Sequence, residues 1–267
     1  MADDLGAMQA YYAQDKERDR LAGGLGRVEL ARTIEVVGRT LPPPPAVVAD
    51  IGGGPGRYTD WLVGAGYDVV HRDVVEHHVA QVRARHGERV DSAVGDARSL
   101  DLPDASVDVV LLLGPLYHLV DAHDRRRALE EAARILRPGG TLHAAAISRW
   151  ATRMDGMLAN RFHLLFPAMA DAVDEVERTG HLAPIVDSGF TGYTHRPGEL
   201  RDEVTAAGFD VGSLVSLEGV AFALGDLDER WADETDRALL LDTLRALESV
   251  PELLGVGPHL LATGRRT

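Results

Sequence analysis

A glycine-rich turn follows the first strongly apolar run of the chain. Every second position of the turn, from 50 to 56, is occupied by Asp50, Gly52, Gly54 and Gly56. A helix is expected directly after it, over 57–63. Glycine tolerates positive φ angles and lets a ligand approach the backbone closely. The N–H groups at the start of a following helix attract phosphate and other electron-rich groups. The turn therefore predicts a site for a nucleotide-like ligand.

The spacing of the glycines distinguishes two such ligands. A dinucleotide-binding turn carries glycine at its first, third and sixth positions, but the sixth position counted from Gly52 is Arg57. The run D-x-G-x-G-x-G instead resembles the first motif of the class I S-adenosylmethionine (SAM) methyltransferases. The resemblance implies SAM as the cofactor, bound at Asp50 and the three glycines. It also implies an α/β, Rossmann-like fold with a mostly parallel seven-stranded sheet, N-terminal helices and a helical lid insertion.

Two acidic residues follow the expected second and third strands. Asp73 lies nineteen positions after Gly54, where an acid at the end of a strand accepts hydrogen bonds from both ribose hydroxyls. The resemblance implies that Asp96 accepts a hydrogen bond from the adenine amino group, with Ala97 and Leu113 also at the cofactor. The alternatives are a solvated loop aspartate at 73 and a turn-forming aspartate at 96. NAD-dependent enzymes do not require an acid at the second position, so this turn favours SAM over NAD.

The segment 107–118 is continuously apolar over 109–113 and predicts a strand that is buried on both faces. Asp121 is expected to cap the next helix, and Gly139 or Gly140 to end it before a strand over 141–147. The ending L-x-P-G-G is typical of the methyltransferases. The run G-P-L-Y-H-L after the apolar strand resembles a subset of small-molecule methyltransferases related to those of quinone biosynthesis.

His118, just past this strand, is the candidate for catalysis. An imidazole titrates near neutrality, so it could contact the acceptor or act as a general base where the acceptor loses a proton. A structural histidine is the alternative. His195 and Glu218 are candidates for the acceptor pocket on position alone, whereas His143, inside a strand, is expected to be packed. His71, His77 and His78 lie in or after the expected second strand without a matching acidic cluster, so we expect no metal site.

The chain is expected to divide into an N-terminal helical segment over 1–45 and a methyltransferase domain over 46–267. The stretch 148–195 is longer than the minimal fold needs, and an insertion of this length beside a pocket is usually a lid. A dimerisation arm is the alternative, and the chain would then be a homodimer. The later elements expected are a helix over 197–207 and strands over 211–217 and 259–263, with helical 229–248 between the strands.

The resemblance also bears on the N-terminal segment. In relatives such a segment folds over the bound cofactor, which implies that Tyr11, Tyr12 and Arg20 line the site. Arg20 would then pair with the methionine carboxylate of SAM. Its alternative partner is Glu17, three positions earlier on the same helix.

The composition excludes several classes of partner. The 42 acidic side chains against 28 basic ones give a formal charge of −14, which disfavours nucleic acids and anionic membranes. The chain has no cysteine, no signal-peptide pattern and no apolar run of membrane-spanning length. We expect a cytoplasmic enzyme that methylates a small molecule at oxygen, nitrogen or carbon, in specialised metabolism. A non-catalytic SAM-binding or regulatory protein is the main alternative, and an NAD-dependent oxidoreductase a weaker one.

Overall fold

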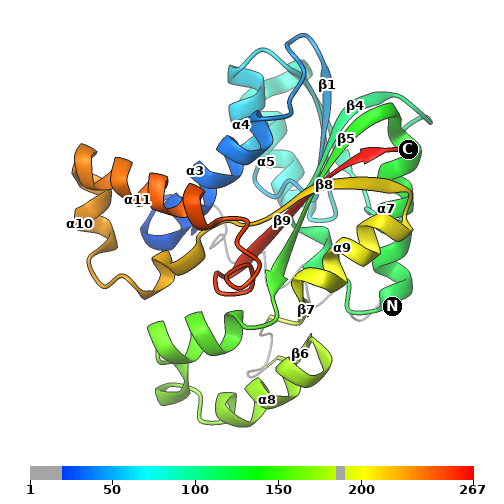
Figure 1. Ribbon diagram of the computed structural model, residues 1–267. Coiled ribbons are helices and arrows are strands. Elements are labelled where there is room, and N and C mark those ends of the chain that lie inside the picture. Colours follow the sequence, from blue (N-terminus) through cyan, green and yellow to red (C-terminus); the bar gives the residue numbers. More distant parts are fainter. Residues whose placement is uncertain (1–19, 185–189) are drawn as a thin grey trace.

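The computed structural model describes residues 20–184 and 190–267, and a sheet with helices on both faces forms its centre (Figure 1). Seven of the nine described strands in the sheet follow the order β3-β2-β1-β4-β5-β9-β8, which is the predicted seven-stranded, mostly parallel arrangement; the other two, β7 and β6, belong to the insertion. Its strands are β1 (Val47–Ile51), β2 (Asp68–Asp73), β3 (Val90–Val94), β4 (Val107–Leu112), β5 (Leu136–Ser148), β8 (Phe209–Ser216) and β9 (His259–Arg266).

The direction of the strands decides where a ligand can bind. The first five strands run parallel, so their carboxyl ends meet at one edge of the sheet. β9 is antiparallel to both β5 and β8, and its first residue, His259, pairs with Ile147 near the end of β5. The start of β9 and the end of β8 therefore lie at the same edge as the ends of the parallel strands.

Helices cover the two faces of the sheet and form separate cores with it. On one face, Leu129 and Leu200 pack in a core with Leu112 of β4. On the other, Leu62 packs in a core with Leu111. Neighbouring residues of β4 thus enter opposite cores, which explains its apolar run over 109–112. The helices that contribute are α7 (Ala122–Ile135) and α9 (Pro197–Ala206) on the first face, and α3 (Gly24–Gly38), α4 (Arg57–Gly64) and α5 (Glu76–His86) on the second.

Asp121 and Asp233 begin helices as N-caps whose side chains accept backbone hydrogen bonds. Asp121 caps α7, as predicted, by accepting hydrogen bonds from two backbone N–H groups at 2.7 and 3.3 Å. Asp233 does the same at 2.8 and 3.0 Å. This second cap splits the predicted helix 229–248 into two helices, α10 (Leu227–Ala232) and α11 (Glu234–Leu247).

The predicted end of α7 at Gly139 or Gly140 is wrong. The helix ends at Ile135, and β5 follows it without a break. Pro138 disfavours the helical conformation at the residue before it and lacks an N–H donor, so the helix ends upstream of the glycines. Both glycines instead lie within β5, where its pairing with β4 shifts register.

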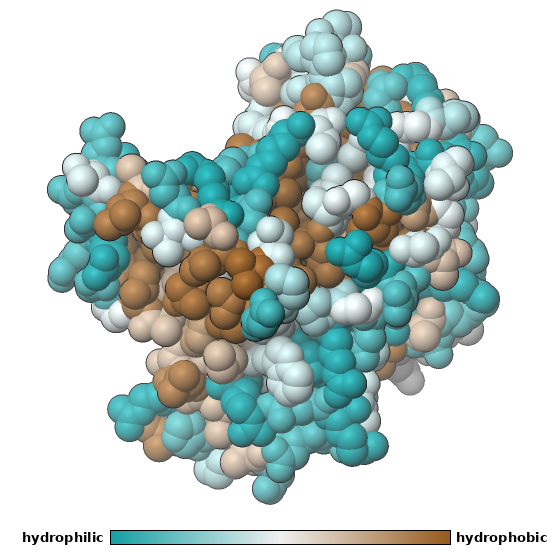
Figure 2. Space-filling view, viewed as in Figure 1, coloured by the Kyte–Doolittle hydropathy of each residue, from teal (hydrophilic) through white to brown (hydrophobic). Residues whose placement is uncertain are grey.

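The insertion over 148–195 is helical only in its first part. It contains the π-helix η2 (Thr152–Ala159), the 3₁₀ turn η3 (Phe162–Leu164), α8 (Met169–Thr179), β6 (His181–Leu182) and β7 (Gly192–His195). The two short strands were not predicted, and β7 extends the sheet by pairing in parallel with the end of β5. Figure 2 shows the insertion as a lobe below the main body, with apolar side chains interrupting its hydrophilic surface.

Candidate functional site

A pocket of about 620 Å³ lies along the carboxyl edge of the sheet. It runs from Asp96 after β3 to His259 at the start of β9, and Phe190 of the insertion contributes to its wall. Its volume lies in the range of small-molecule and cofactor sites. The predicted site residues that line it are Arg20, Asp50, Gly52, Gly54, Asp73, Asp96, Ala97, Leu113 and His118. The predicted Tyr11 and Tyr12 lie outside the described residues.

The glycine-rich turn enters the pocket between β1 and α4. Gly52 and Gly54 have φ angles of 68° and 56°, a region that favours glycine. Asp50 lies buried beneath the turn and accepts a hydrogen bond from Thr59 Oγ1 at 2.7 Å. Burial raises the pKa of Asp50 against the opposing effect of His71. Asp50 therefore supports the turn from below as well as touching the pocket.

Gly56 is not among the residues that line the pocket, so its predicted contact with the cofactor stays a prediction. It is the N-cap of α4, with a φ of 87°. A Cβ at this position would lie 2.6 Å from a methyl group of Val82 in α5. Glycine here serves the turn into α4 and its packing against α5. The pattern D-x-G-x-G-x-G alone does not separate these two uses of glycine.

Asp73 ends β2 with its carboxylate at the pocket. Oδ2 accepts the backbone N–H of Gly54 at 2.8 Å, and Oδ1 accepts the N–H of Val75 at 2.8 Å and lies 3.2 Å from Nδ1 of His78. Burial alone would raise the pKa of Asp73, but His78 and the two backbone donors outweigh burial and lower it. The structure thus maintains an ionised acceptor at the position predicted for ribose binding.

Asp96 follows β3 and is fixed by the residue two positions later. It accepts hydrogen bonds from the backbone N–H of Arg98 at 2.9 Å and from its guanidinium at 2.6 Å. Burial would raise the pKa of Asp96, but the interactions with Arg98 outweigh burial and lower it. Arg98 in turn pairs with Asp124 of α7 at 2.6 Å. Asp96 is therefore both a turn aspartate and a pocket residue, and the two alternatives for it are compatible.

His118 ends the short helix α6 (Pro115–His118) and lies in the pocket wall. Its ring centroid is 4.8 Å from that of Tyr117 and 5.2 Å from that of Phe190. Burial of the ring lowers its pKa to about 4, although the charge of Asp73 opposes this. A neutral imidazole among aromatic rings suits contact with an acceptor, whereas so low a pKa makes it a weak base near neutrality.

Arg20 lies at the pocket next to α3. It forms a bidentate ion pair with Glu29 of that helix, at 2.5 and 2.9 Å. Glu17, its alternative predicted partner, lies outside the described residues. The predicted pairing of Arg20 with the methionine carboxylate of SAM stays a prediction, and Glu29 is an additional pocket residue that the sequence pattern did not suggest.

Two residues, His195 and Glu218, are predicted at the acceptor pocket from their position in the sequence. Neither of them lines the pocket. His195 is completely buried, and its Nε2 lies 3.1 Å from Glu203, so it belongs to the contact between the insertion and α9. Glu218 is also completely buried, but it holds His259, which does line the pocket. His143 is packed, as predicted, with its ring nitrogens 3.0 and 3.1 Å from two threonine hydroxyls.

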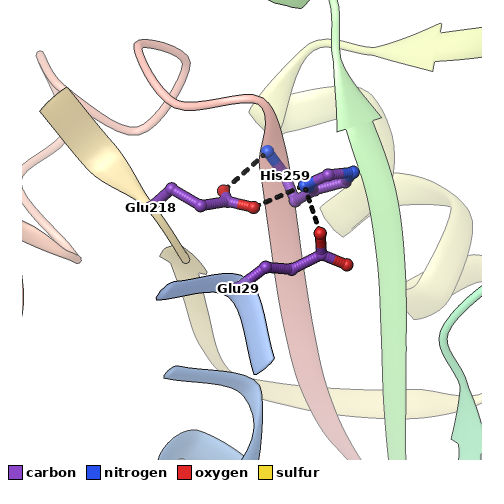
Figure 3. A group of neighbouring side chains, drawn as sticks. All are labelled: Glu29, Glu218 and His259. Atoms are coloured by element: carbon purple, nitrogen blue, oxygen red, sulfur yellow. Dashed lines mark hydrogen bonds and ion pairs between the residues drawn. The ribbon is translucent and has the colours of Figure 1, made fainter. Parts of the chain in front are cut away.

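Among the described residues, one group has the spacing of metal ligands. The ligand atoms of Glu29, Glu218 and His259 all lie within 4.8 Å of one another (Figure 3). The missed signal was topological, because Glu218 follows the predicted sixth strand and His259 begins the predicted seventh. Antiparallel pairing of those two strands brings the residues together at the edge.

Comparison with known proteins identifies the family. The model of the methyltransferase domain family matches residues 49–144, a stretch that includes the glycine-rich turn, Asp73 and Asp96. This stretch of the chain is a methyltransferase domain of the class I SAM-dependent type. SAM is the cofactor of this family, and the acids at the ends of β2 and β3, together with the glycine-rich turn, fit it in this structure.

The matched relatives agree with this family over less than half of this chain. An uncharacterized methyltransferase of Mycobacterium tuberculosis is 38% identical over 119 residues, which is 45% of this chain and 45% of the relative. A ubiquinone/menaquinone biosynthesis C-methyltransferase of Acidiphilium cryptum is 34% identical over 121 residues, 43% of this chain and 47% of the relative. The chain thus spans about half the length of the curated relatives that it matches.

A solved structure extends the likeness in fold to nearly the whole chain. A SAM-dependent methyltransferase of Thermotoga maritima, a possible histamine N-methyltransferase, superposes with a TM-score of 0.62 at 21% identity, covering 98% of this chain and 99% of that one. Within the described part of this chain, no helix is both long enough and apolar enough to span a membrane.

Proposed function

We propose that this chain transfers a methyl group from SAM to a small-molecule acceptor. The observation that carries the proposal is the row of cofactor-type groups along one edge of the sheet. Asp96, Asp73 and the turn at Gly52 follow β3, β2 and β1 in spatial order and line one pocket. In this arrangement the adenine, the ribose and the methionine part of SAM lie over three neighbouring strands.

The rest of the pocket is assigned to the acceptor. It extends over β4, β5 and β9, where His118, Phe190 and His259 form its wall. SAM supplies an activated methyl group on a sulfonium, so the protein has to place the acceptor atom in line with the departing sulfur and exclude water. The formal charge of −14 disfavours polyanionic acceptors such as nucleic acids. A small, largely uncharged or cationic acceptor fits this half of the pocket.

The main alternative is a protein of the same fold that binds SAM without turning it over, since fold alone does not establish function. Incubation with methyl-labelled SAM and a panel of small hydroxyl, amine and activated-carbon compounds separates the two. The enzyme is expected to give a labelled product and an equal amount of S-adenosylhomocysteine (SAH). Tight SAH binding without any labelled product across the panel would favour the non-catalytic alternative.

A further inference from the structure

His259 at the pocket wall is held by glutamates from two distant parts of the chain (Figure 3). Glu218 follows β8, and Glu29 belongs to α3. The side chain of Glu218 is fully buried, and that of His259 is 19% exposed. The cofactor-type groups lie at β1, β2 and β3, so a histidine at β9 belongs to the part of the pocket assigned to the acceptor.

Glu218 fixes both the position and the tautomer of this histidine. Oε1 of Glu218 lies 2.5 Å from Nδ1 of His259, and Oε2 accepts the backbone N–H of His259 at 3.1 Å. A carboxylate that accepts from Nδ1 keeps the proton on that atom and orients the ring. Figure 3 shows the second nitrogen, Nε2, on the side of the ring away from both carboxylates. Nε2 is therefore the atom that His259 offers to a ligand.

The charges around the ring would stabilise a proton taken up at Nε2. Oε2 of Glu29 lies 3.8 Å from Nδ1 of His259, and both oxygens of Glu29 are paired with Arg20. The guanidinium of Arg20 balances one of the two negative charges. The imidazolium that forms when His259 takes up a proton balances the other.

Two further titratable groups face the cluster from other elements. Burial raises the pKa of Asp155 in η2, and the charges of His259 and Glu218 act on it in opposite directions. Burial and the charge of Glu29 raise the pKa of Tyr58 in α4. Neither group cancels the stabilising effect that the two carboxylates of Glu218 and Glu29 have on a protonated His259.

We infer that His259, oriented by Glu218, takes the proton from a protic acceptor, an O–H or N–H compound, during methyl transfer. The inference rests on the proposed function. The acceptor oxygen or nitrogen forms a bond to the methyl carbon, and the S–CH₃ bond breaks with its electron pair going to sulfur, which gives SAH. The acceptor proton moves to Nε2 of His259 and then to water.

The pKa of His259 is close to that of one class of acceptor, the phenols. Burial alone would lower the pKa of His259, but the charges of Glu218 and Glu29 outweigh it and raise the value to about 9. A phenolic hydroxyl has a pKa of about 10, and a general base works best when its pKa is close to that of the group it deprotonates and to the working pH. Turnover should therefore rise with pH, roughly tenfold per unit below the pKa.

A metal site made of the same three residues fits the contacts less well. Nδ1 of His259 is engaged by Glu218, and both oxygens of Glu29 are engaged by Arg20. A cation would have to displace these partners, and the guanidinium of Arg20 would repel it. Insensitivity of the activity to EDTA is therefore expected.

Nitrogen-15 NMR of histidine in the full chain with SAH bound tests the geometry without knowledge of the acceptor. The neutral ring of His259 should carry its proton on Nδ1, and its pKa should fall by about 1 pH unit or more in Glu218→Gln. A neutral ring protonated at Nε2, or a titration unchanged in Glu218→Gln, would overturn the inference, because Nε2 could then not accept a proton from the acceptor.

Turnover with methyl-labelled SAM and a panel of phenols, alcohols and primary amines tests the chemistry. His259→Gln should lose about 10²–10⁴-fold in rate while keeping SAH affinity. His77→Gln, an exposed histidine of α5 away from the pocket, is the matched control and should keep the rate. Full activity in His259→Gln, methylation confined to acceptors without an ionisable proton, or EDTA inactivation reversed by Mg²⁺ or Zn²⁺ would overturn the inference. Failure of the wild type to bind SAH would instead contradict the proposed function.

Discussion

The carboxylate of Asp73 holds the backbone of Gly54, with Oδ2 accepting its N–H at 2.8 Å. The two residues belong to different elements, the end of β2 and the turn after β1. The acid proposed for the ribose hydroxyls thus also positions the turn proposed for the methionine part of SAM. These two parts of the cofactor site form together.

This coupling predicts a large effect of one substitution on cofactor binding. Asp73→Ala should weaken SAH binding by about 1.5–3 kcal/mol, the range for a hydrogen bond to a charged group. Titration calorimetry measures the affinity, and a thermal melt checks the fold. Asp68→Asn, at the exposed start of the same strand, is the control and should bind SAH like the wild type. Equal affinity in folded Asp73→Ala would remove this acid from the site.

His118 should make the protein less stable in acid. Burial lowers its folded pKa to about 4, whereas an unfolded histidine titrates near 6.5. Between these values the unfolded state binds more protons, so the free energy of unfolding should fall as pH drops from about 6.5 to 4. Urea unfolding at several pH values should show a shallower fall in His118→Phe. Identical slopes in the two proteins would mean that His118 titrates normally and is available as a base.

His259 should have the opposite effect at alkaline pH. Its folded pKa, about 9, lies above the ordinary value, so its contribution to stability is complete below about 6.5 and is lost as pH rises through 9. The wild type should therefore lose stability between pH 7 and 10 more steeply than His259→Gln. The same urea series measures this. Parallel curves would show that the two glutamates do not stabilise a charged imidazole.

The insertion is proposed to be a lid, because Phe190 lies in the pocket wall and β7 joins the sheet beside the pocket. Its exposed large apolar side chains are compatible with the alternative, a dimerisation arm; they are Trp150, Leu158, Phe162, Leu164, Leu165 and Phe166. Amide exchange over 148–184 should slow when SAH and an acceptor bind. Protection that instead follows protein concentration and ignores ligand would support the arm.

Local patterns were enough to predict several residues that line the pocket, at the end proposed for the cofactor. Asp50, Gly52 and Gly54 come directly after a buried strand, and Asp73 ends the next one, so the parallel arrangement alone brings them to one edge. Gly56 follows the same pattern but serves helix packing, because the neighbour that requires glycine there, Val82, is distant in sequence. A short motif cannot distinguish a ligand from a packed side chain.

The acceptor end depends on contacts between distant segments. His259 meets Glu218 only because β9 reverses between β5 and β8, and Glu29 reaches them from a helix at the other end of the chain. The short strand β7 pairs with two residues of β5, too few to leave an alternating pattern in the sequence. These contacts and this strand depend on how the sheet assembles. Local periodicity in the sequence therefore does not predict them.

Calorimetric titration of the full chain with SAH, with its 6-oxo analogue S-inosylhomocysteine and with NAD tests the central claim most directly. The pocket should bind one SAH per chain and should not bind NAD. The 6-oxo analogue should bind more weakly by about 1.5–3 kcal/mol, because it removes the amino donor proposed to face the carboxylate of Asp96. Binding of NAD in place of SAH, or no binding of SAH by the folded protein, would contradict the account.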